Sequence, residues 1–120
     1  MRVRVTISGP DGHSDRAPEF TKAEITIGRR PTNDVVIPDA SASGAHARVM
    51  VTGGALTILD LDSTNGTAVN SEPLQGPRLL DDGDVVEIGD FSLRFALNKS
   101  GGTVASQTPD GAGPGSDVGP

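Results

Sequence analysis

Apolar and polar residues alternate along this chain in short runs. In the first run, Arg2 to Ile7, charged side chains stand between apolar ones with a period of two, the pattern of a strand with one buried face. Glu19 to Ile27 repeats this period less regularly. Further apolar runs, each bounded by Gly, Pro, Asn or Asp, follow at residues 34–37, 47–51, 55–61, 67–69, 77–80, 84–88 and 91–97. No segment keeps a helical period, so the pattern predicts an all-β fold.

Several boundaries between these runs are turn sequences. Gly53-Gly54 and Gly89-Asp90 each separate two apolar runs and predict tight hairpins, while Asp82-Gly83 opens another strand. Many short strands joined by frequent turns are typical of a β-sandwich. We therefore expect antiparallel pairing, with the loops gathered at the ends of the sandwich.

The composition limits the content of the core. The chain has 120 residues, of which 2% are aromatic, and it has no Trp or Tyr, so the core must consist mainly of Val, Ile, Leu and Ala. Its largest side chains are expected to be Phe20, Phe91 and Phe95. We expect one domain over residues 1–97. Residues 98–120 are rich in Gly, Pro and Ser and predict a disordered tail or linker, in which Thr103 and Thr108 are candidate phosphorylation sites.

Charge and composition argue against several functions. The formal net charge of −6 disfavours sequence-independent binding of nucleic acid, which needs a basic face. The chain has no cysteine and therefore no disulfide and no zinc–thiolate site. No apolar run reaches the length of a membrane span, and the first residues lack the apolar segment of a signal peptide. We expect a cytoplasmic protein with no cofactor, no nucleic-acid partner and no membrane insertion.

Three polar clusters stand where predicted strands give way to loops. They are Gly28-Arg29, Ser43-Gly44-Ala45-His46 and Ser63-Thr64-Asn65-Gly66-Thr67. Each places hydroxyl, amide, imidazole or guanidinium groups beside glycine, which lets backbone N–H groups approach a ligand closely. An arginine fork also matches the geometry of a phosphate or a carboxylate. Together the clusters predict a phosphate receptor.

Two other chemistries fit the clusters less well. Ser43 and His46 supply a hydroxyl and a base, but they lack a defined third partner and the strained Gly-x-Ser-x-Gly turn of a hydrolase, so we expect no catalytic residue. The acidic segment from Asp60 onward imitates a calcium loop, but it lacks Gly at the sixth position and Glu at the twelfth. The turn at 81–84 has no distant acidic partner and is expected to be solvated. We therefore expect no metal site.

In order and spacing, the three clusters resemble the forkhead-associated domain family, and the resemblance extends from about Arg2 to Leu97. It implies an antiparallel β-sandwich of about eleven short strands, whose loops at one end bind a phosphothreonine peptide. The implied partner is a phosphothreonine-containing protein, such as a Ser/Thr kinase or its substrate. By position, the resemblance assigns phosphopeptide contacts to Arg29, Ser43, Thr64 and Asn65. It assigns loop-shaping roles to Gly28, His46 and Gly66.

One position departs from the pattern of this family. Many members carry Arg, Lys or Asn after the loop serine, whereas this chain has Gly44. Either Arg30 or Arg48 compensates for the missing contact, or the domain binds phosphothreonine weakly or not at all. The alternative function is therefore a forkhead-associated scaffold that binds a protein partner independently of phosphate.

Overall fold

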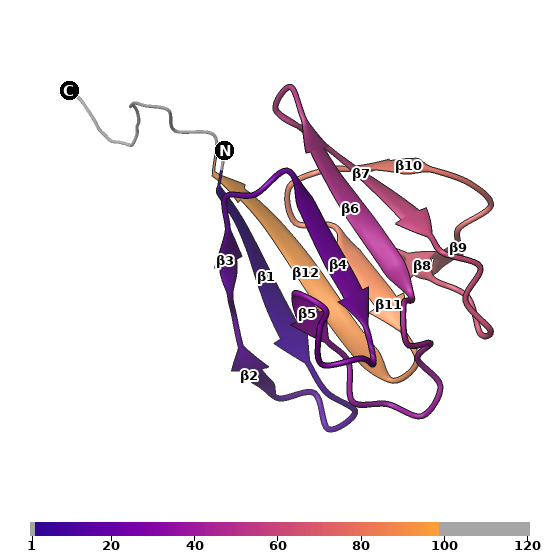
Figure 1. The fold of residues 1–120 in the computed structure, drawn as a ribbon. Coiled ribbons are helices and arrows are strands. Elements are labelled where there is room, and N and C mark those ends of the chain that lie inside the picture. The colour runs from indigo at the N-terminus through magenta and orange to yellow at the C-terminus, as the bar shows by residue number, and fades with distance from the viewer. Residues whose placement is uncertain (1, 99–120) are drawn as a thin grey trace.

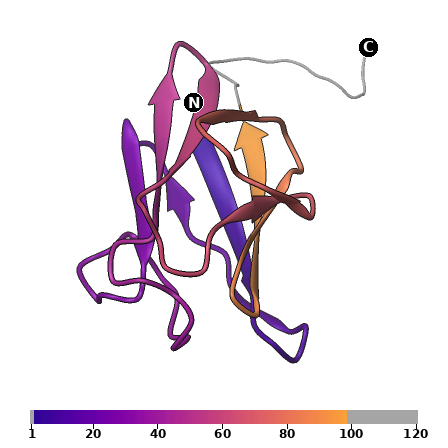
Figure 2. The ribbon, with the colours of Figure 1, turned by 90° about the vertical axis from the view of Figure 1, so that its right-hand side faces the viewer.

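Two β-sheets packed face to face form the fold of the computed structural model, which describes residues 2–98 (Figure 1). The first sheet contains β1 (Arg2–Ser8), β2 (Ser14–Arg16), β3 (Glu19–Phe20), β8 (Ala68–Val69), β9 (Glu72–Pro73), β11 (Val85–Ile88) and β12 (Phe91–Asn98). The second sheet contains β4 (Glu24–Gly28), β5 (Val35–Val36), β6 (Ala47–Thr52), β7 (Ala55–Asp60) and β10 (Arg78–Leu80). Figure 2 shows the two layers after a quarter turn. The predicted all-β sandwich is confirmed.

The first and last strands of the domain lie side by side. The first sheet has the order β2-β1-β12-β11-β8-β9, with β3 also beside β1, and the second has the order β10-β7-β6-β4-β5. β1 pairs with β12 along its whole length, from Arg2 opposite Asn98 to Ser8 opposite Ser92. β12 therefore runs one residue past the predicted domain end. The candidate phosphorylation sites Thr103 and Thr108 lie outside the described residues.

The expectation of antiparallel pairing is wrong for one pair of strands. β5 runs parallel to β4, with Val35 opposite Ile27. The reason is local, because the Asp34 carboxylate accepts the Thr26 backbone N–H at 2.9 Å while the Asp34 N–H donates to the Thr26 hydroxyl at 2.9 Å. These bonds fold the chain back beside the middle of β4, so that β5 starts in the same direction as β4.

The predicted strand from Glu19 to Ile27 is in fact divided between the two sheets. Its first part is β3, which pairs with β1, and its last part is β4, which pairs with β6. Residues 21–23 cross between the layers and are exposed, which explains the irregular period of this segment. Two further strands, β2 and β9, were not predicted because neither has an apolar alternation.

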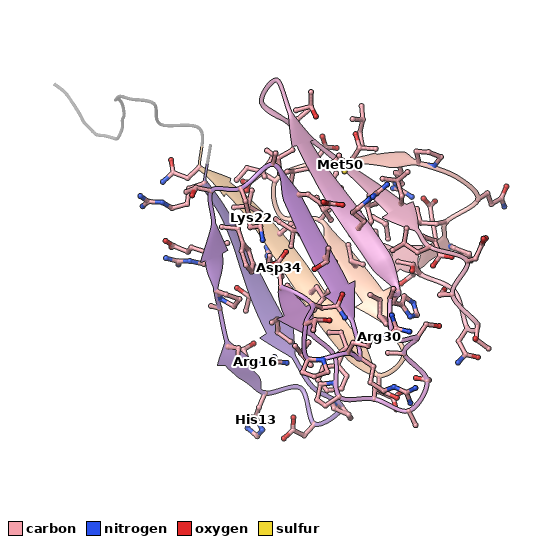
Figure 3. All side chains as sticks on the ribbon, viewed as in Figure 1. His13, Arg16, Lys22, Arg30, Asp34 and Met50 are labelled. Atoms are coloured by element: carbon pink, nitrogen blue, oxygen red, sulfur yellow. The ribbon has the colours of Figure 1, made fainter. Side chains whose placement is uncertain are left out.

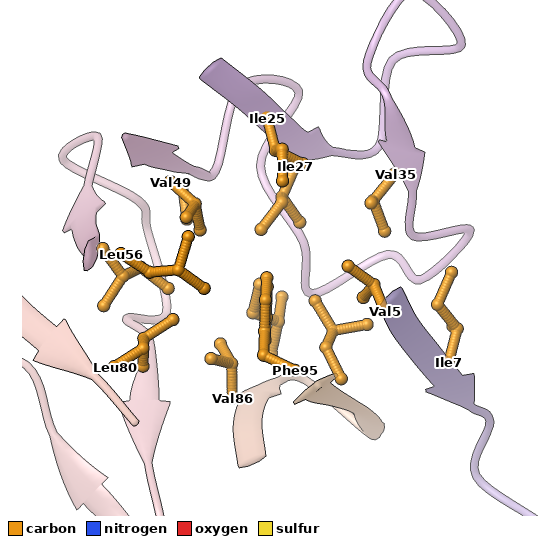
Figure 4. Packing of buried hydrophobic residues seen from close by; sticks show 14 of the residues in the cluster. Val5, Ile7, Ile25, Ile27, Val35, Val49, Leu56, Leu80, Val86 and Phe95 are labelled. Carbon is orange, nitrogen blue, oxygen red and sulfur yellow. The ribbon is translucent and has the colours of Figure 1, made fainter. Parts of the chain in front are cut away.

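The core lies between the two sheets and is mainly aliphatic (Figure 4). Alternate residues of β1 point inward, namely Val3, Val5 and Ile7. Of the three phenylalanines, Phe95 is fully buried, whereas Phe20 and Phe91 are partly buried and pack against the core. The buried side chains pack the two sheets against each other, and the loops extend from the ends of the strands.

None of the residues described forms a helix of the length and hydrophobicity needed to cross a membrane. Within the same range, no group of three or more His, Asp or Glu side chains is arranged to hold a metal ion.

Candidate functional site

The three predicted polar clusters lie at one end of the sandwich. β4 ends at Gly28, and its antiparallel neighbour β6 begins at Ala47, which stands opposite Ile27. β7 runs antiparallel to β6 and ends at Asp60, which also stands opposite Ala47. The segments leaving these strand ends meet at the lower edge of the second sheet in Figure 1. We call them the loop cluster, which comprises residues 28–34, 41–46 and 60–67.

Gly28 allows the first two loops to approach each other. It is buried, and a Cβ at this position would lie 2.3 Å from the Gly44 carbonyl oxygen and 2.8 Å from Nδ2 of Asn33. The next residue continues the contact, since the Arg29 N–H donates to the Ser43 carbonyl at 2.9 Å. A larger side chain at position 28 would separate the loops at the point where they carry their polar groups.

The Asn33 side chain holds the same two loops together. Its Nδ2 donates to the carbonyl oxygens of Arg30 at 2.9 Å and Gly44 at 2.8 Å. The Asn33 backbone N–H also donates to the Arg30 carbonyl, at 3.1 Å. Asn33 was not predicted as a site residue, and its signal in the sequence was its place in the turn-forming run Pro31-Thr32-Asn33.

His46 joins the second loop to the third. Its ring is fully buried, the Ser43 backbone N–H lies 3.0 Å from Nδ1, and Nε2 lies 2.9 Å from the Gly66 carbonyl oxygen. Because a backbone N–H can only donate, Nδ1 is the acceptor, and the ring proton sits on Nε2 and is donated to Gly66. The imidazole therefore fixes both loops through their backbones.

The third loop is organised by Asp60, whose place in the sequence had suggested no more than a false calcium loop. Its carboxylate accepts the Ser63 backbone N–H at 3.0 Å and the hydroxyls of Ser63 and Thr67. Burial raises the pKa of Asp60, but the hydrogen bonds from Ser63 and Thr67 outweigh burial and hold this pKa below its usual value. The Gly66 N–H then donates to the Ser63 hydroxyl oxygen at 3.0 Å, and Gly66 takes a left-handed φ of 85°.

Two of the predicted contact residues are linked across loops. The Thr64 backbone N–H donates to Oγ of Ser43 at 3.1 Å, and Nδ2 of Asn65 donates to the Ser41 carbonyl at 2.8 Å. Ser41 is itself held by Asp39, which accepts the Ser41 N–H and hydroxyl at 2.8 and 2.7 Å. These bonds place Ser43 and Asn65 in one arrangement before any ligand binds.

The cations in and around the loop cluster differ in their partners. Lys22 pairs with Asp34 at 2.7 Å, and both residues are labelled in Figure 3. Arg48 pairs with Glu24 at 3.0 Å. Arg29 and Arg30 are exposed, and neither guanidinium has a hydrogen bond or ion pair among the described residues. The loops thus offer two guanidinium groups without a carboxylate partner, on a loop whose main chain bonds Ser43, and this combination suits an anion.

The same geometry argues against a serine nucleophile. Both ring nitrogens of His46 are used by backbone groups, Nδ1 by Ser43 N–H and Nε2 by the Gly66 carbonyl. Neither nitrogen contacts the Ser43 hydroxyl, so the base that would activate this hydroxyl is missing from the arrangement. In this arrangement His46 is not placed to deprotonate Ser43.

Residues 25–89, more than half of the chain, match the FHA domain family. The chain belongs to this family. Over 78 residues it is 45% identical to an ABC transporter ATP-binding/permease protein of Mycobacterium tuberculosis, a match that covers 65% of this chain and 9% of the transporter. Over 70 residues it is 41% identical to the glycogen accumulation regulator GarA of Mycolicibacterium smegmatis, covering 58% of this chain and 44% of GarA. The chain thus spans less than half the length of either relative.

Solved FHA domains have the same fold. One, from work on phosphothreonine-dependent FHA domain interactions, matches with a TM-score of 0.70 and 30% identity over 81% of this chain and 99% of that domain. EmbR of Mycobacterium tuberculosis, in complex with a low-affinity phosphopeptide, matches with a TM-score of 0.69 and 32% identity over 85% of this chain and 26% of EmbR. The recognised family therefore agrees with the resemblance found in the three polar clusters.

Proposed function

We propose that this FHA domain binds phosphothreonine-containing peptides and so mediates phosphorylation-dependent protein–protein interaction. One observation carries the proposal: the backbone of the loop cluster is satisfied internally, by Asn33, His46 and Asp60, while Arg29 and Arg30 remain without a counter-charge. A preordered site with an excess of donors binds a dianion without first reorganising its loops. The phosphothreonine-dependent FHA domain and the EmbR phosphopeptide complex support this choice of ligand.

The proposed residue roles are those that the family resemblance assigns by position, and the contacts between the loops support them. Arg29 and the Ser43 hydroxyl contact the phosphate. Thr64, whose N–H donates to Ser43 Oγ, contacts the ligand next to the phosphate. Asn65 holds the peptide backbone with the part of its amide that does not bond Ser41. Gly28, His46 and Gly66 shape the loops without contacting the ligand.

The partner and setting complete the proposal. The FhaA FHA domain, a structural neighbour with a TM-score of 0.68 and 29% identity, was solved in complex with the intracellular domain of Rv3910. By analogy, the partner of this domain is a phosphothreonine-bearing segment of a Ser/Thr kinase or of a kinase substrate, met in the cytoplasm. The domain acts there as a binding module and not as an enzyme.

The proposal is tested by removing Arg29. A degenerate phosphothreonine peptide pool is used to select one binding peptide, whose Kd is then measured for the wild type and for Arg29→Ala. Losing one charge-assisted hydrogen bond weakens binding by about 10- to 150-fold. Arg94→Ala, which removes the same charge from an exposed position of β12, is the matched control and leaves the Kd unchanged.

A second candidate function rests on Gly44, which offers no side chain to a ligand. In that case the domain is a scaffold that binds a protein surface without phosphate. Inorganic phosphate and added salt separate the two candidates, because both weaken the binding of a phosphopeptide and leave a neutral protein contact almost untouched. Equal binding of the phosphorylated and unphosphorylated forms of the selected peptide would establish the scaffold instead.

A further inference from the structure

Gly44 and Arg30 occupy one region of the loop cluster. A Cβ built on Gly44 would lie 2.9 Å from Nε of Arg30, 3.2 Å from its Cγ and 3.3 Å from its Cζ. The Arg30 side chain therefore lies across the surface that a side chain at position 44 would fill, and Figure 3 shows it at the loop end of the second sheet. The missing side chain of residue 44 is replaced in space by that of Arg30.

The main chain holds Arg30 firmly at this place. Its N–H donates to the Gly44 carbonyl at 3.2 Å, and its own carbonyl accepts both the backbone N–H and the Nδ2 of Asn33. Gly44 directly follows Ser43, whose hydroxyl faces the third loop through Thr64. The guanidinium thus starts from a fixed backbone beside the proposed phosphate position, and no described carboxylate neutralises it.

Arg48, the other arginine considered for this role, is committed elsewhere. Its strand neighbours Ala47 and Val49 are fully buried, so Arg48 points to the outer face of the second sheet. There its guanidinium pairs with Glu24 at 3.0 Å. A contact between Arg48 and a ligand in the loop cluster would first require this pair to break.

We propose that Arg30 is a second phosphate-contacting residue of this domain, and that Gly44 is the vacancy that lets the Arg30 side chain reach the phosphate. This inference rests on the proposed function, because it names a further contact in the same site. The effects of substitutions at positions 30 and 44 are therefore expected to depend on each other. Arg30 supplies the positive charge, and the absence of a side chain at Gly44 leaves the space that the Arg30 side chain occupies.

The experiment measures the Kd of the phosphothreonine peptide selected above, by calorimetry or NMR titration, for a set of single variants. We expect Arg30→Ala to weaken binding by about tenfold or more, as for one lost charge-assisted bond. Arg48→Ala and the matched control Arg94→Ala, which lower the net charge equally, are expected to change the Kd by less than about twofold, as for screened distant charges.

Gly44→Ala tests the spatial half of the proposal. The three atoms nearest the new Cβ all belong to the flexible side chain of Arg30, and Gly44 does not have a left-handed φ, so we expect this variant to fold with wild-type stability. It displaces the guanidinium and weakens phosphopeptide binding in the wild type, but has no further effect in an Arg30→Ala background. The double variant Arg30→Ala/Gly44→Arg returns a guanidinium to the same space and regains affinity over Arg30→Ala alone.

The outcomes separate this inference from the proposed function. If Arg29→Ala weakens binding as expected while Arg30→Ala behaves like Arg94→Ala, the domain binds phosphothreonine but Arg30 has no part in it. If Arg48→Ala carries the loss instead, the compensating charge comes from the strand and the inference is overturned. If the wild type does not distinguish phosphorylated from unphosphorylated peptide, the proposed function itself fails.

Discussion

The two ends of the sandwich carry polar, glycine-containing turns that differ in what they leave unpaired. At the end opposite the loop cluster, the turn at 81–84 uses its acids as acceptors for its own and neighbouring backbone: Asp84 accepts the Asp81 N–H at 2.8 Å, and Asp82 accepts the Leu97 N–H at 2.7 Å. In the loop cluster, Asp60 and His46 perform the same internal task. The loop cluster also contains Arg29 and Arg30, whose guanidinium groups pair with no carboxylate among the described residues.

The difference shows that an ordered polar turn is not by itself a binding site. In both the acidic turn and the loop cluster, side chains form hydrogen bonds with backbone groups, and these bonds give each a fixed shape. The acidic turn has acceptors facing solvent and repels an anion, whereas the loop cluster has donors left over and attracts one. In the candidate site the backbone is already hydrogen-bonded, and positively charged donors are left over for a ligand. This excess of donors distinguishes the candidate site from the structural turn.

The largest effect is expected from breaking the interior of the loop cluster at His46. His46→Ala leaves the Ser43 N–H and the Gly66 carbonyl without their partners and opens a cavity, at a cost of about 2–4 kcal/mol in the free energy of unfolding. Phosphopeptide affinity falls as well, because Ser43 and the third loop lose their fixed spacing. Urea unfolding and peptide titration of the same protein sample measure the two effects.

The second histidine of the chain supplies the control for this variant. His13 is exposed, and among the described residues its ring bonds only the nearby Asp11. His13→Ala is expected to stay within about 0.5 kcal/mol of the wild type in stability and to bind peptide normally. A His46→Ala protein as stable as His13→Ala would show that the imidazole does not hold the loops.

A smaller effect is expected at Gly28, where the loops approach most closely. In Gly28→Ala the new Cβ would stand 2.3 Å from a backbone oxygen that cannot turn away, so the loops must move, at a cost of about 1–3 kcal/mol. Peptide binding weakens with the displacement of Arg29. Gly76→Ala, at a position with no atom within 4 Å and no left-handed φ, tests whether any Gly to Ala change has this effect. Equal stability of the two variants would contradict the close approach.

The sequence was sufficient to predict the sandwich and the meeting of the polar clusters. Strict alternation in β1 and the glycine turns carry that information locally, and the cluster spacing carries the family resemblance. The parallel β5 and the division of the 19–27 run were not predictable in the same way. Both depend on contacts between segments, such as the hydrogen bonds that Thr26 donates to the Asp34 carboxylate. The periodicity of the sequence does not indicate such contacts.

The supporting residues of the site escaped prediction for a related reason. Asn33, Asp39 and Asp60 look like ordinary turn residues, because their partners lie on other loops or depend on the turn's exact path. The choice between Arg30 and Arg48 was equally open in the sequence. Only the three-dimensional pairing of Arg48 with Glu24 and the position of Arg30 over Gly44 favour one of them.

The smallest effect is expected at Asp84 in the acidic turn, where the stability of the fold depends on pH. The hydrogen bond from the Asp81 N–H, joined by one from Asn70, holds the pKa of Asp84 below its usual value in spite of some burial. A lowered pKa in the folded state stabilises the fold above the unfolded pKa of about 3.9, and this contribution is lost as the pH falls through the folded pKa.

Asp84→Asn is therefore expected to cost at most about 1 kcal/mol at pH 7, since the site is partly solvated, and the gap to the wild type closes as the pH falls below about 4. Urea unfolding of both proteins from pH 7 to pH 3 measures this. Phosphopeptide affinity at pH 7 is unchanged, because the turn lies at the far end from the loop cluster. A stability gap that persists at pH 3 would mean that packing, and not the ionised carboxylate, holds the turn, while a loss of affinity would mean that the two ends are coupled through the sheets.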